Sequence, residues 1–235
     1  MIYRLTKSKF ILGLQCEKAL YLDVYRPQLA RFTPETLARF RKGRDFEASV
    51  KATFPNGLDV SKILGKQISK YPEYTTAILT QPGEQTLFEA GFVFDEVLIL
   101  ADVVHKDNDG SVSIFEIKNS TSVKDVFRRD VCIQNYVIGN SIEKMCENKA
   151  IPLRMKSFSI LYNNGDDSAA QYDMTAEAEE AKGMIAKQVA RFKEVLQNLE
   201  PTMDIGEQCT KPYECPYILY CKGKQTVQLE LGDLQ

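Results

Sequence analysis

The strongest constraint on the fold is a pair of apolar segments that carry charged residues in their interior. Residues 97–104 form an apolar run in which Asp102 is the only charged residue. Such a run is typical of a strand buried on both faces, where an unpaired carboxylate is costly. The next apolar segment, residues 112–118, adds Glu116 and Lys118. The two segments therefore predict neighbouring strands with ionisable groups inside an apolar sheet.

The loop between these segments predicts how they pair. Residues 108–110 read Asn-Asp-Gly, which suits a three-residue hairpin loop with Gly110 in the left-handed conformation. Centring the hairpin on Asp109 places Asp102 opposite Glu116, and opposed residues share a sheet face with Cβ atoms roughly 5 Å apart. Lys118, two residues after Glu116, shares that face. From the residues alone, the trio is either a metal site with a neighbouring cation or a buried salt bridge.

The remaining pattern predicts a single α/β (α+β) domain over residues 1–235, with a mixed β-sheet flanked by helices. The expected helices cover residues 7–14, 34–53, 123–147 and 175–199, the expected strands residues 85–94, 97–106, 112–119 and 156–163, and residues 55–84 are expected to be irregular. Three strands in a meander, then a helix and a further strand, give a sheet with both parallel and antiparallel pairs. The length of 235 residues is enough for one sizeable core.

Composition excludes several classes of site and protein. His105 is the only histidine, and its place beside a turn argues against Ser-His-Asp or Cys-His catalysis. The sequence has no apolar run of about 18 residues and no signal-peptide core at its start, so we expect a cytoplasmic protein without a membrane partner. Residues 1–51 hold 11 Lys/Arg against 5 Asp/Glu, although the net charge of the chain is −2. This basic third suits either a polyanion or ordinary solvated helix faces.

The trio resembles the core of the PD-(D/E)XK nucleases, in particular their RecB-like branch. Ala101-Asp102 and Glu116-Ile117-Lys118 match the family motif. The resemblance implies a restriction-endonuclease-like core over about residues 34–163, with Asp102, Glu116 and the Ile117 carbonyl holding Mg²⁺ or Mn²⁺ and with Lys118 catalytic. This chemistry suits the residue types, because hard oxygen ligands bind these ions and a lysine can orient water and neutralise phosphate.

Two more residues are carried over from the same resemblance. Residues 43–47, Gly-Arg-Asp-Phe-Glu, fit the family's first motif and make Glu47 a candidate third metal ligand. Gln134 fits the glutamine of the family's helical motif, whereas Tyr136 does not have the family spacing and is expected to pack in the core. Without the resemblance, Glu47 reads as a solvated helix residue and Gln134 as a structural amide.

The six cysteines separate into two groups. Cys132 and Cys146 fall in a predicted helix and are expected to be small buried groups. The other four are one cysteine near the start and three in the tail, namely Cys16, Cys209, Cys215 and Cys221. Three closely spaced thiols with prolines between them suggest a soft-metal site, and spacing leaves zinc and iron–sulfur equally open. The plain alternative is four unrelated buried thiols.

The layout of these four cysteines resembles AddB-type and CRISPR-associated RecB-like exonucleases, which have one cysteine before the nuclease core and three after it. The resemblance implies a [4Fe–4S] cluster, with Zn²⁺ as the alternative, that joins residues 1–33 to the tail 200–235. The chain departs from those families in having five residues between Cys209 and Cys215, where two are usual. This different spacing bears on which metal or cluster the four cysteines hold more than on whether they form one site.

The sequence thus leads to an expected function with alternatives. We expect a Mg²⁺- or Mn²⁺-dependent DNA nuclease, exonuclease-like on single-stranded or end-containing DNA. One alternative is a non-catalytic iron–sulfur module with a nuclease-like core that binds nucleic acid or a protein partner. The other is a redox-sensing iron–sulfur protein.

Overall fold

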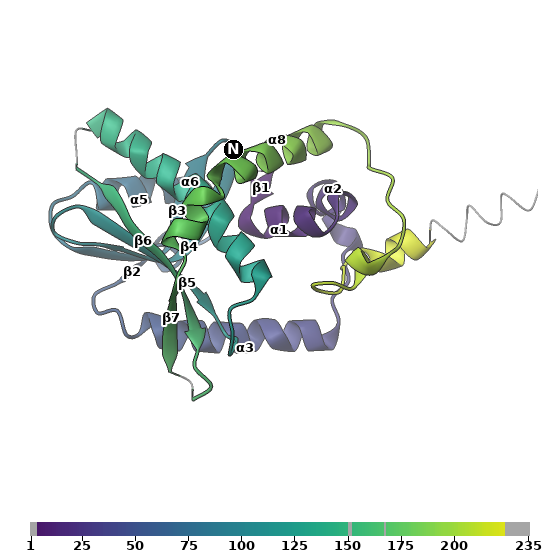
Figure 1. Ribbon diagram of the computed structural model, residues 1–235, viewed down its shortest axis with the longest axis horizontal. Coiled ribbons are helices and arrows are strands. Elements are labelled where there is room, and N and C mark those ends of the chain that lie inside the picture. Colours follow the sequence, from purple (N-terminus) through teal and green to yellow (C-terminus); the bar gives the residue numbers. More distant parts are fainter. Residues whose placement is uncertain (1–3, 150–151, 167, 224–235) are drawn as a thin grey trace, which may run out of the picture. The chain divides into compact units, whose positions relative to one another are not determined.

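The computed structural model describes residues 4–149, 152–166 and 168–223 (Figure 1). Parts of the predicted N-terminal segment and tail, residues 1–3 and 224–235, lie outside this description. The chain divides into two compact units: unit 1 comprises Met1–Lys7 and Arg39–Ala186, and unit 2 comprises Ser8–Ala38 and Lys187–Gln235. The sheet belongs to unit 1, and unit 2 is built from segments far apart in the sequence.

The bounds of the elements are as follows. The strands are β1 (Leu5–Thr6), β2 (Leu58–Asp59), β3 (Gln85–Phe94), β4 (Val97–Lys106), β5 (Ser111–Lys118), β6 (Arg154–Asn163) and β7 (Ala169–Asp173). The helices are α1 (Lys7–Gln15), α2 (Glu17–Tyr25), α3 (Pro34–Lys51), α4 (Val60–Leu64), α5 (Tyr71–Leu79), α6 (Asp125–Lys149), α7 (Thr175–Glu180) and α8 (Lys182–Gln197). Short 3-10 turns cover η1 (Pro27–Leu29), η2 (Ile68–Lys70) and η3 (Glu207–Cys209).

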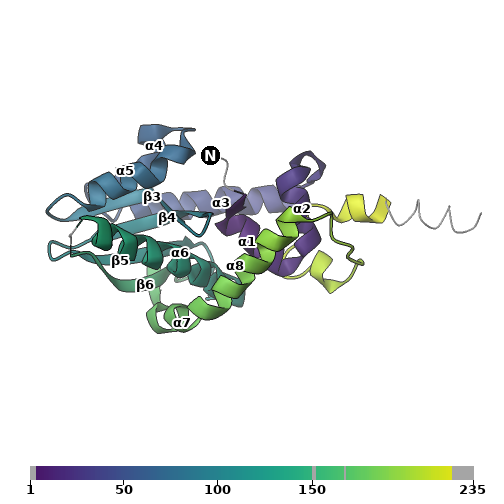
Figure 2. The ribbon, with the colours of Figure 1, turned by 90° about the horizontal axis from the view of Figure 1, so that it is seen from above.

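The seven strands form one mixed sheet in the order β2-β3-β4-β5-β6-β7, with β1 paired to β4. Strands β3, β4 and β5 make an antiparallel meander, and α6 then carries the chain over to β6, which pairs in parallel with β5. Helix α5 runs beside β3, and α6 contacts β3, β4 and β6 (Figure 2). The predicted α/β class with a mixed sheet flanked by helices is confirmed.

Local turn chemistry sets the register of the meander. At the first hairpin, Asp95 and Glu96 both have positive φ (49° and 62°), as a two-residue type I′ turn requires. At the second, Gly110 has φ 83°, and a Cβ there would lie 2.1 Å from the Pro152 carbonyl oxygen, so only glycine fits. Asp109 accepts a hydrogen bond from the Ser111 amide (2.9 Å), which closes the turn.

Residues of α6 and the unit 1 part of α3 cover opposite faces of β5. Gln134 of α6 reaches Glu116, while the buried side chains of α3 pack on the neighbouring Ile117. Successive strand residues point to opposite faces, so α6 and α3 lie on either side of the sheet (Figure 1). The cluster under α3 consists of Phe46, Val50, Phe88, Val103, Ile117 and Leu161.

Residues 55–84 are more ordered than their prolines and glycines predicted. They contain β2, α4, η2 and α5, so the expectation of an irregular segment is wrong. Pro72 is the reason for part of the error, because it stands in the first turn of α5, where proline is tolerated rather than disruptive. The strand β7 and the helix α2 were also not predicted.

The helix expected over residues 175–199 is divided at Ala181 into α7 and α8. The Ala181 amide donates to Glu177 O and the Ile185 amide donates to Ala181 O, so hydrogen bonds continue across the division. The longest helix, α6, spans 25 residues and carries many charged side chains. Over the described ranges of the chain, no helix combines the length and the apolar character needed to cross a bilayer.

Candidate functional site

The charged trio lies where β4 and β5 separate. Their pairing runs from Lys106↔Val112 to Val103↔Phe115, and the next step in this register is the predicted pair of Asp102 and Glu116. At that step the ladder stops, and the Ile117 amide donates instead to Asp102 Oδ2 at 2.8 Å. Since β3 occupies the other edge of β4, β1 joins β4 on the side that β5 has left. The two acids therefore face a gap between strands.

Glu116 is the most densely contacted residue of this gap. Its side chain is 1% exposed and accepts from Lys7 Nζ at both oxygens (2.9 and 3.0 Å), from Lys118 Nζ (2.5 Å) and from Gln134 Nε2 (2.8 Å). Burial by itself raises the pKa of Glu116, but the charges of Lys118 and Lys7 outweigh burial and hold that pKa well below its usual value. Glu116 is thus an ionised carboxylate at neutral pH.

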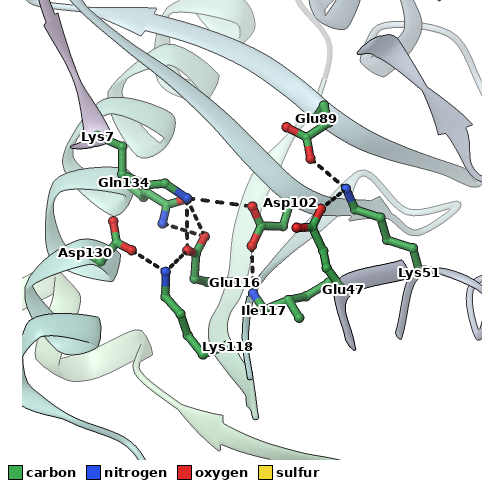
Figure 3. Close-up of polar contacts among 10 residues, drawn as sticks. All are labelled: Lys7, Glu47, Lys51, Glu89, Asp102, Glu116, Ile117, Lys118, Asp130 and Gln134. Carbon is green, nitrogen blue, oxygen red and sulfur yellow. Dashed lines mark hydrogen bonds and ion pairs between the residues drawn. The ribbon is translucent and has the colours of Figure 1, made fainter. Parts of the chain in front are cut away.

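Lys118 is held between two acids from different elements (Figure 3). Its Nζ lies 2.5 Å from Glu116 Oε1 and 2.6 Å from Asp130 Oδ2 of α6. Burial lowers the pKa of Lys118, but the negative charges of Asp130 and Glu116 prevail and raise it above the usual value. Lys118 is therefore a fixed cation, suited to neutralise or orient a group rather than to accept a proton.

Asp102 has the opposite electrostatic character from Glu116. Burial, followed by repulsion from Glu116, raises the pKa of Asp102 to about 8, although Lys7 lies 3.7 Å away and partly offsets the effect. Of the two carboxylates in this gap, Glu116 is thus charged and Asp102 is largely protonated at neutral pH. Like-charge pairs with too few cations behave in this way.

Glu47, the candidate third ligand, is engaged in a neighbouring pair of contacts. Lys51 Nζ lies 2.5 Å from Glu47 Oε1 and 2.6 Å from Glu89 Oε1, and Figure 3 shows this group beside Asp102. Glu89 has φ 53°, a conformation that non-glycine residues rarely adopt in the middle of a strand. Among the described contacts, no hydrogen bond or ion pair links Glu47 directly to Asp102 or Glu116.

Four residues of this cluster escaped the sequence reasoning: Lys7, Lys51, Glu89 and Asp130. Asp130 precedes Gln134 by four residues on one helix, so the two share a face, and this spacing was available as a signal. Lys7 is 109 residues from Glu116 in the chain, and no local pattern connects them. Tyr136 packs in the core as expected, with its hydroxyl donating to Asp95 and its ring against Phe94.

The residues of Figure 3 match a divalent cation in kind and in charge. The five carboxylates and three lysines drawn there sum to −2 when all are ionised (3 − 5), and to −1 while Asp102 is protonated (3 − 4). Asp130 Oδ1 and Gln134 Oε1 are buried acceptors without a hydrogen-bond donor among the described residues. Hard oxygen donors with excess negative charge suit Mg²⁺ or Mn²⁺. Across residues 4–149, 152–166 and 168–223, however, no three His, Cys, Asp or Glu side chains stand ready to ligate a metal ion.

In unit 2, the four predicted metal-binding cysteines line one small cavity of about 10 Å³. Cys16 is the N-cap of α2, Cys209 ends η3, Cys215 follows a loop, and Cys221 lies in helical residues 218–223. Leu22, Ile205 and Ile218 are among the apolar residues of the wall. Burial raises the pKa of the Cys215 thiol to about 11, and burial raises that of Cys221 in the same direction. The cavity thus gathers four thiols, two of which have pKa values raised by burial.

Direct hydrogen bonds hold this cavity together. Gln15 Nε2 donates to Gln208 O and to Tyr213 O, both at 2.7 Å, and the Cys215 amide donates to Cys209 O at 2.9 Å. The remaining two cysteines lie elsewhere: Cys132 is buried in α6, and the Cys146 thiol donates to Leu153 O. Four sulfur donors from two distant segments match a soft metal or an iron–sulfur cluster in kind.

Comparisons with known proteins add little to this geometry. No protein-family profile matches the chain. No curated protein matches it either. The chain is similar to a solved structure titled "Crystal structure of SSO0001", with 13% sequence identity, a TM-score of 0.48, and coverage of 94% of this chain and 86% of that one.

Proposed function

We propose that this chain is a metal-dependent DNA nuclease of the PD-(D/E)XK superfamily, within its RecB-like branch. The observation that carries the proposal is the meeting of Asp102, Glu116 and Lys118 in the gap between β4 and β5. A buried salt bridge alone needs neither the excess of acids nor the two unsatisfied oxygens beside it. The sequence resemblance supports the same assignment.

Each residue has a role that follows from its contacts. A divalent cation at Asp102, Glu116 and the Ile117 carbonyl would supply charge to polarise a scissile phosphate and to acidify water. Lys118 is kept charged by Asp130 and so can neutralise phosphate or orient water. Gln134 fixes one Glu116 oxygen through its amide nitrogen, and its amide oxygen is a buried acceptor without a donor among the described residues. Glu47 becomes a third ligand if its ion pair with Lys51 breaks and Lys51 keeps only its ion pair with Glu89.

The exposed part of α3 supports single-stranded DNA as the substrate. Residues 39–44 read Arg-Phe-Arg-Lys-Gly-Arg, and all four basic side chains are exposed. Phe40 is 45% exposed, and Asn119, the residue after β5, donates to Lys42 O at 2.9 Å. Arginines that contact phosphates beside an aromatic ring that stacks on bases are the usual means of holding a single strand.

Cleavage of labelled oligonucleotides tests the nuclease. Single- and double-stranded substrates are incubated with Mg²⁺, Mn²⁺ or EDTA and with the variants Asp102→Asn and Lys118→Met, whose folding is checked by thermal melting. We expect metal-dependent cleavage that prefers single strands or ends and that both variants lose. Full activity in either folded variant contradicts the assignment.

Salt-dependent binding tests the surface on α3. The triple variant R41Q/K42Q/R44Q is compared with K62Q/K66Q/K70Q, which removes three exposed lysines in or near α4. Binding of a fluorescent single strand is measured in the Asp102→Asn background, so that cleavage does not interfere. The first triple is expected to lower the slope of log affinity against log salt by about 2, because each phosphate contact on a single strand contributes roughly 0.7. Equal slopes for both triples contradict this surface.

We also propose that Cys16, Cys209, Cys215 and Cys221 hold a [4Fe–4S] cluster, with Zn²⁺ as the alternative. Their shared cavity supports the proposal, and their free thiols suit a reducing, cytoplasmic setting. Broad absorbance near 400 nm together with iron and sulfide analysis tests for the cluster, whereas a colourless protein with stoichiometric zinc establishes the alternative.

A second candidate function is a non-catalytic module that binds nucleic acid or a partner. Its support is that Lys7 and Lys118 already neutralise Glu116, so the cluster is coherent as a set of ion pairs. Tight DNA binding without cleavage under any of the metals would favour this candidate.

A further inference from the structure

Lys7 stands directly against the two acids that the proposed nuclease needs for its metal. Its Nζ lies 2.9 and 3.0 Å from the two oxygens of Glu116 and 3.7 Å from Asp102 Oδ1 (Figure 3). A lysine ammonium is positively charged at neutral pH. A positive charge therefore contacts Glu116 and lies beside Asp102.

The short strand β1 brings Lys7 to this place. Leu5 and Thr6 pair in parallel with Val97 and Leu98 of β4, on the edge from which β5 has separated. Lys7 follows at once as the first residue of α1, so its side chain enters the gap. Its side chain is 23% exposed.

The acceptor positions on Glu116 are fully used. An ionised carboxylate offers about four lone-pair sites. Lys7 takes two of them, Lys118 one and Gln134 one. A metal ligated by Glu116 must therefore displace one of these donors.

Lys7 is the donor best able to leave. Gln134 is fully buried, and Lys118 has a second anchor in Asp130 at 2.6 Å. Lys7 has ion pairs only with the same two acids that would hold the cation, among those the described residues show. When a metal takes these acids, Lys7 loses its attraction and meets a like charge.

We propose that Lys7 is a built-in competitor for the metal site. It neutralises Glu116 and lies beside Asp102 while the metal is absent, and it moves away from Glu116 when a divalent cation binds. This inference rests on the proposed nuclease function and adds a control on its metal affinity.

Mn²⁺ titration followed by electron paramagnetic resonance or calorimetry, without DNA, tests the competition. Lys7→Gln is expected to bind Mn²⁺ about tenfold more tightly than the wild type, because the cation no longer has to displace a bound lysine. Lys7→Arg keeps the charge and should retain the wild-type affinity. Lys9→Gln is the matched control, since Lys9 lies on the same helix but pairs with Asp23. Equal or weaker Mn²⁺ binding by Lys7→Gln overturns the proposal.

Lysine footprinting of the wild-type protein gives an independent answer if Lys7→Gln does not fold. Reductive methylation, read by mass spectrometry, should label Lys7 slowly without metal and at least about threefold faster with saturating Mn²⁺, as the displaced end reaches solvent. An unchanged rate overturns the proposal. Metal-dependent cleavage with no effect of Lys7 on Mn²⁺ affinity removes the competitor but keeps the nuclease. No Mn²⁺ binding by either protein, and no cleavage, overturns both.

Discussion

The acid–lysine cluster of unit 1 and the cysteine cavity of unit 2 are both candidate metal sites, yet they are built on opposite principles. In unit 1, every acid of the cluster in Figure 3 has a polar partner, and lysines supply most of the compensating charge. In unit 2, the thiols lie among apolar residues, and burial raises the pKa values of Cys215 and Cys221. Hence a cation exchanges with lysine and with the proton of Asp102 in the first site, whereas in the second it must displace the protons of Cys215 and Cys221.

This difference predicts how each site depends on its metal. Because lysines can replace the cation, unit 1 should fold without metal and lose only its chemistry. Unit 2 has a direct scaffold, including the Phe10–Phe192 ring contact (5.3 Å) and the Arg191–Glu17 ion pair (2.9 Å). Metal binding to thiolates would add folding free energy to that scaffold, since such sites couple binding to folding.

The largest effect expected is on cleavage by Asp102→Asn. The variant should lose at least about 10²-fold in rate, as removal of a direct charge-stabilising group usually does. Its melting temperature without metal should remain within about 2 °C of the wild type, because Asp102, with a pKa raised to about 8, is already largely protonated at pH 7. Single-turnover cleavage and a thermal melt on the same preparation check both points. A large fall in stability would instead make Asp102 a structural residue.

The next largest effect concerns the cysteine cavity. Cys215→Ser should lose the bound metal and lower the melting temperature by about 10 °C, which corresponds to a few kcal/mol for a chain of this size. Cys132→Ser, outside the cavity, is the control and should keep its metal. Metal analysis and calorimetry provide the readout. Full metal content in Cys215→Ser would separate that thiol from the site.

A smaller effect is expected for the acids bridged by Lys51. Glu47→Gln should weaken Mn²⁺ binding about tenfold, as loss of a ligand or its close support commonly does. Glu89→Gln removes the other partner of Lys51 and should change the affinity less than about threefold. Parallel Mn²⁺ titrations compare the two. The reverse order would give Glu89 the role that the sequence assigned to Glu47.

The smallest effect is expected at Gln15, which ties the N-terminal segment to the cysteine loop. Gln15→Ala removes two hydrogen bonds and should cost about 1–2 kcal/mol, or a few °C in melting temperature, with the metal content unchanged. Gln28→Ala, at an exposed position, is the control and should melt as the wild type does. Loss of metal in Gln15→Ala would show that metal binding depends on these hydrogen bonds.

Sequence reasoning succeeded where the signal was local. The strands β3 and β4 have the predicted bounds, and the hairpin centred on Asp109 keeps the predicted register as far as Val103 and Phe115, one step before Asp102 and Glu116. Alternation and turn residues fix such features within about twenty residues. Sequence reasoning failed in residues 55–84, where Pro72, in the first turn of α5, was taken for a helix breaker. Proline is tolerated in the first turn of a helix and is also common in loops. The residue type therefore does not distinguish the two positions, and only the packing of the surrounding segment does.

The sequence by itself determined which chemistry is present: the acids and lysine of one hairpin, and four thiols without histidines to join them. Only the tertiary structure decided what surrounds them. It brought Lys7 onto Glu116 from 109 residues away, joined Lys51 to Glu89, and closed Cys16 into one cavity with Cys209. Long-range contacts of this kind depend on how whole elements pack, because each side chain is placed by neighbours that its own sequence context does not contain.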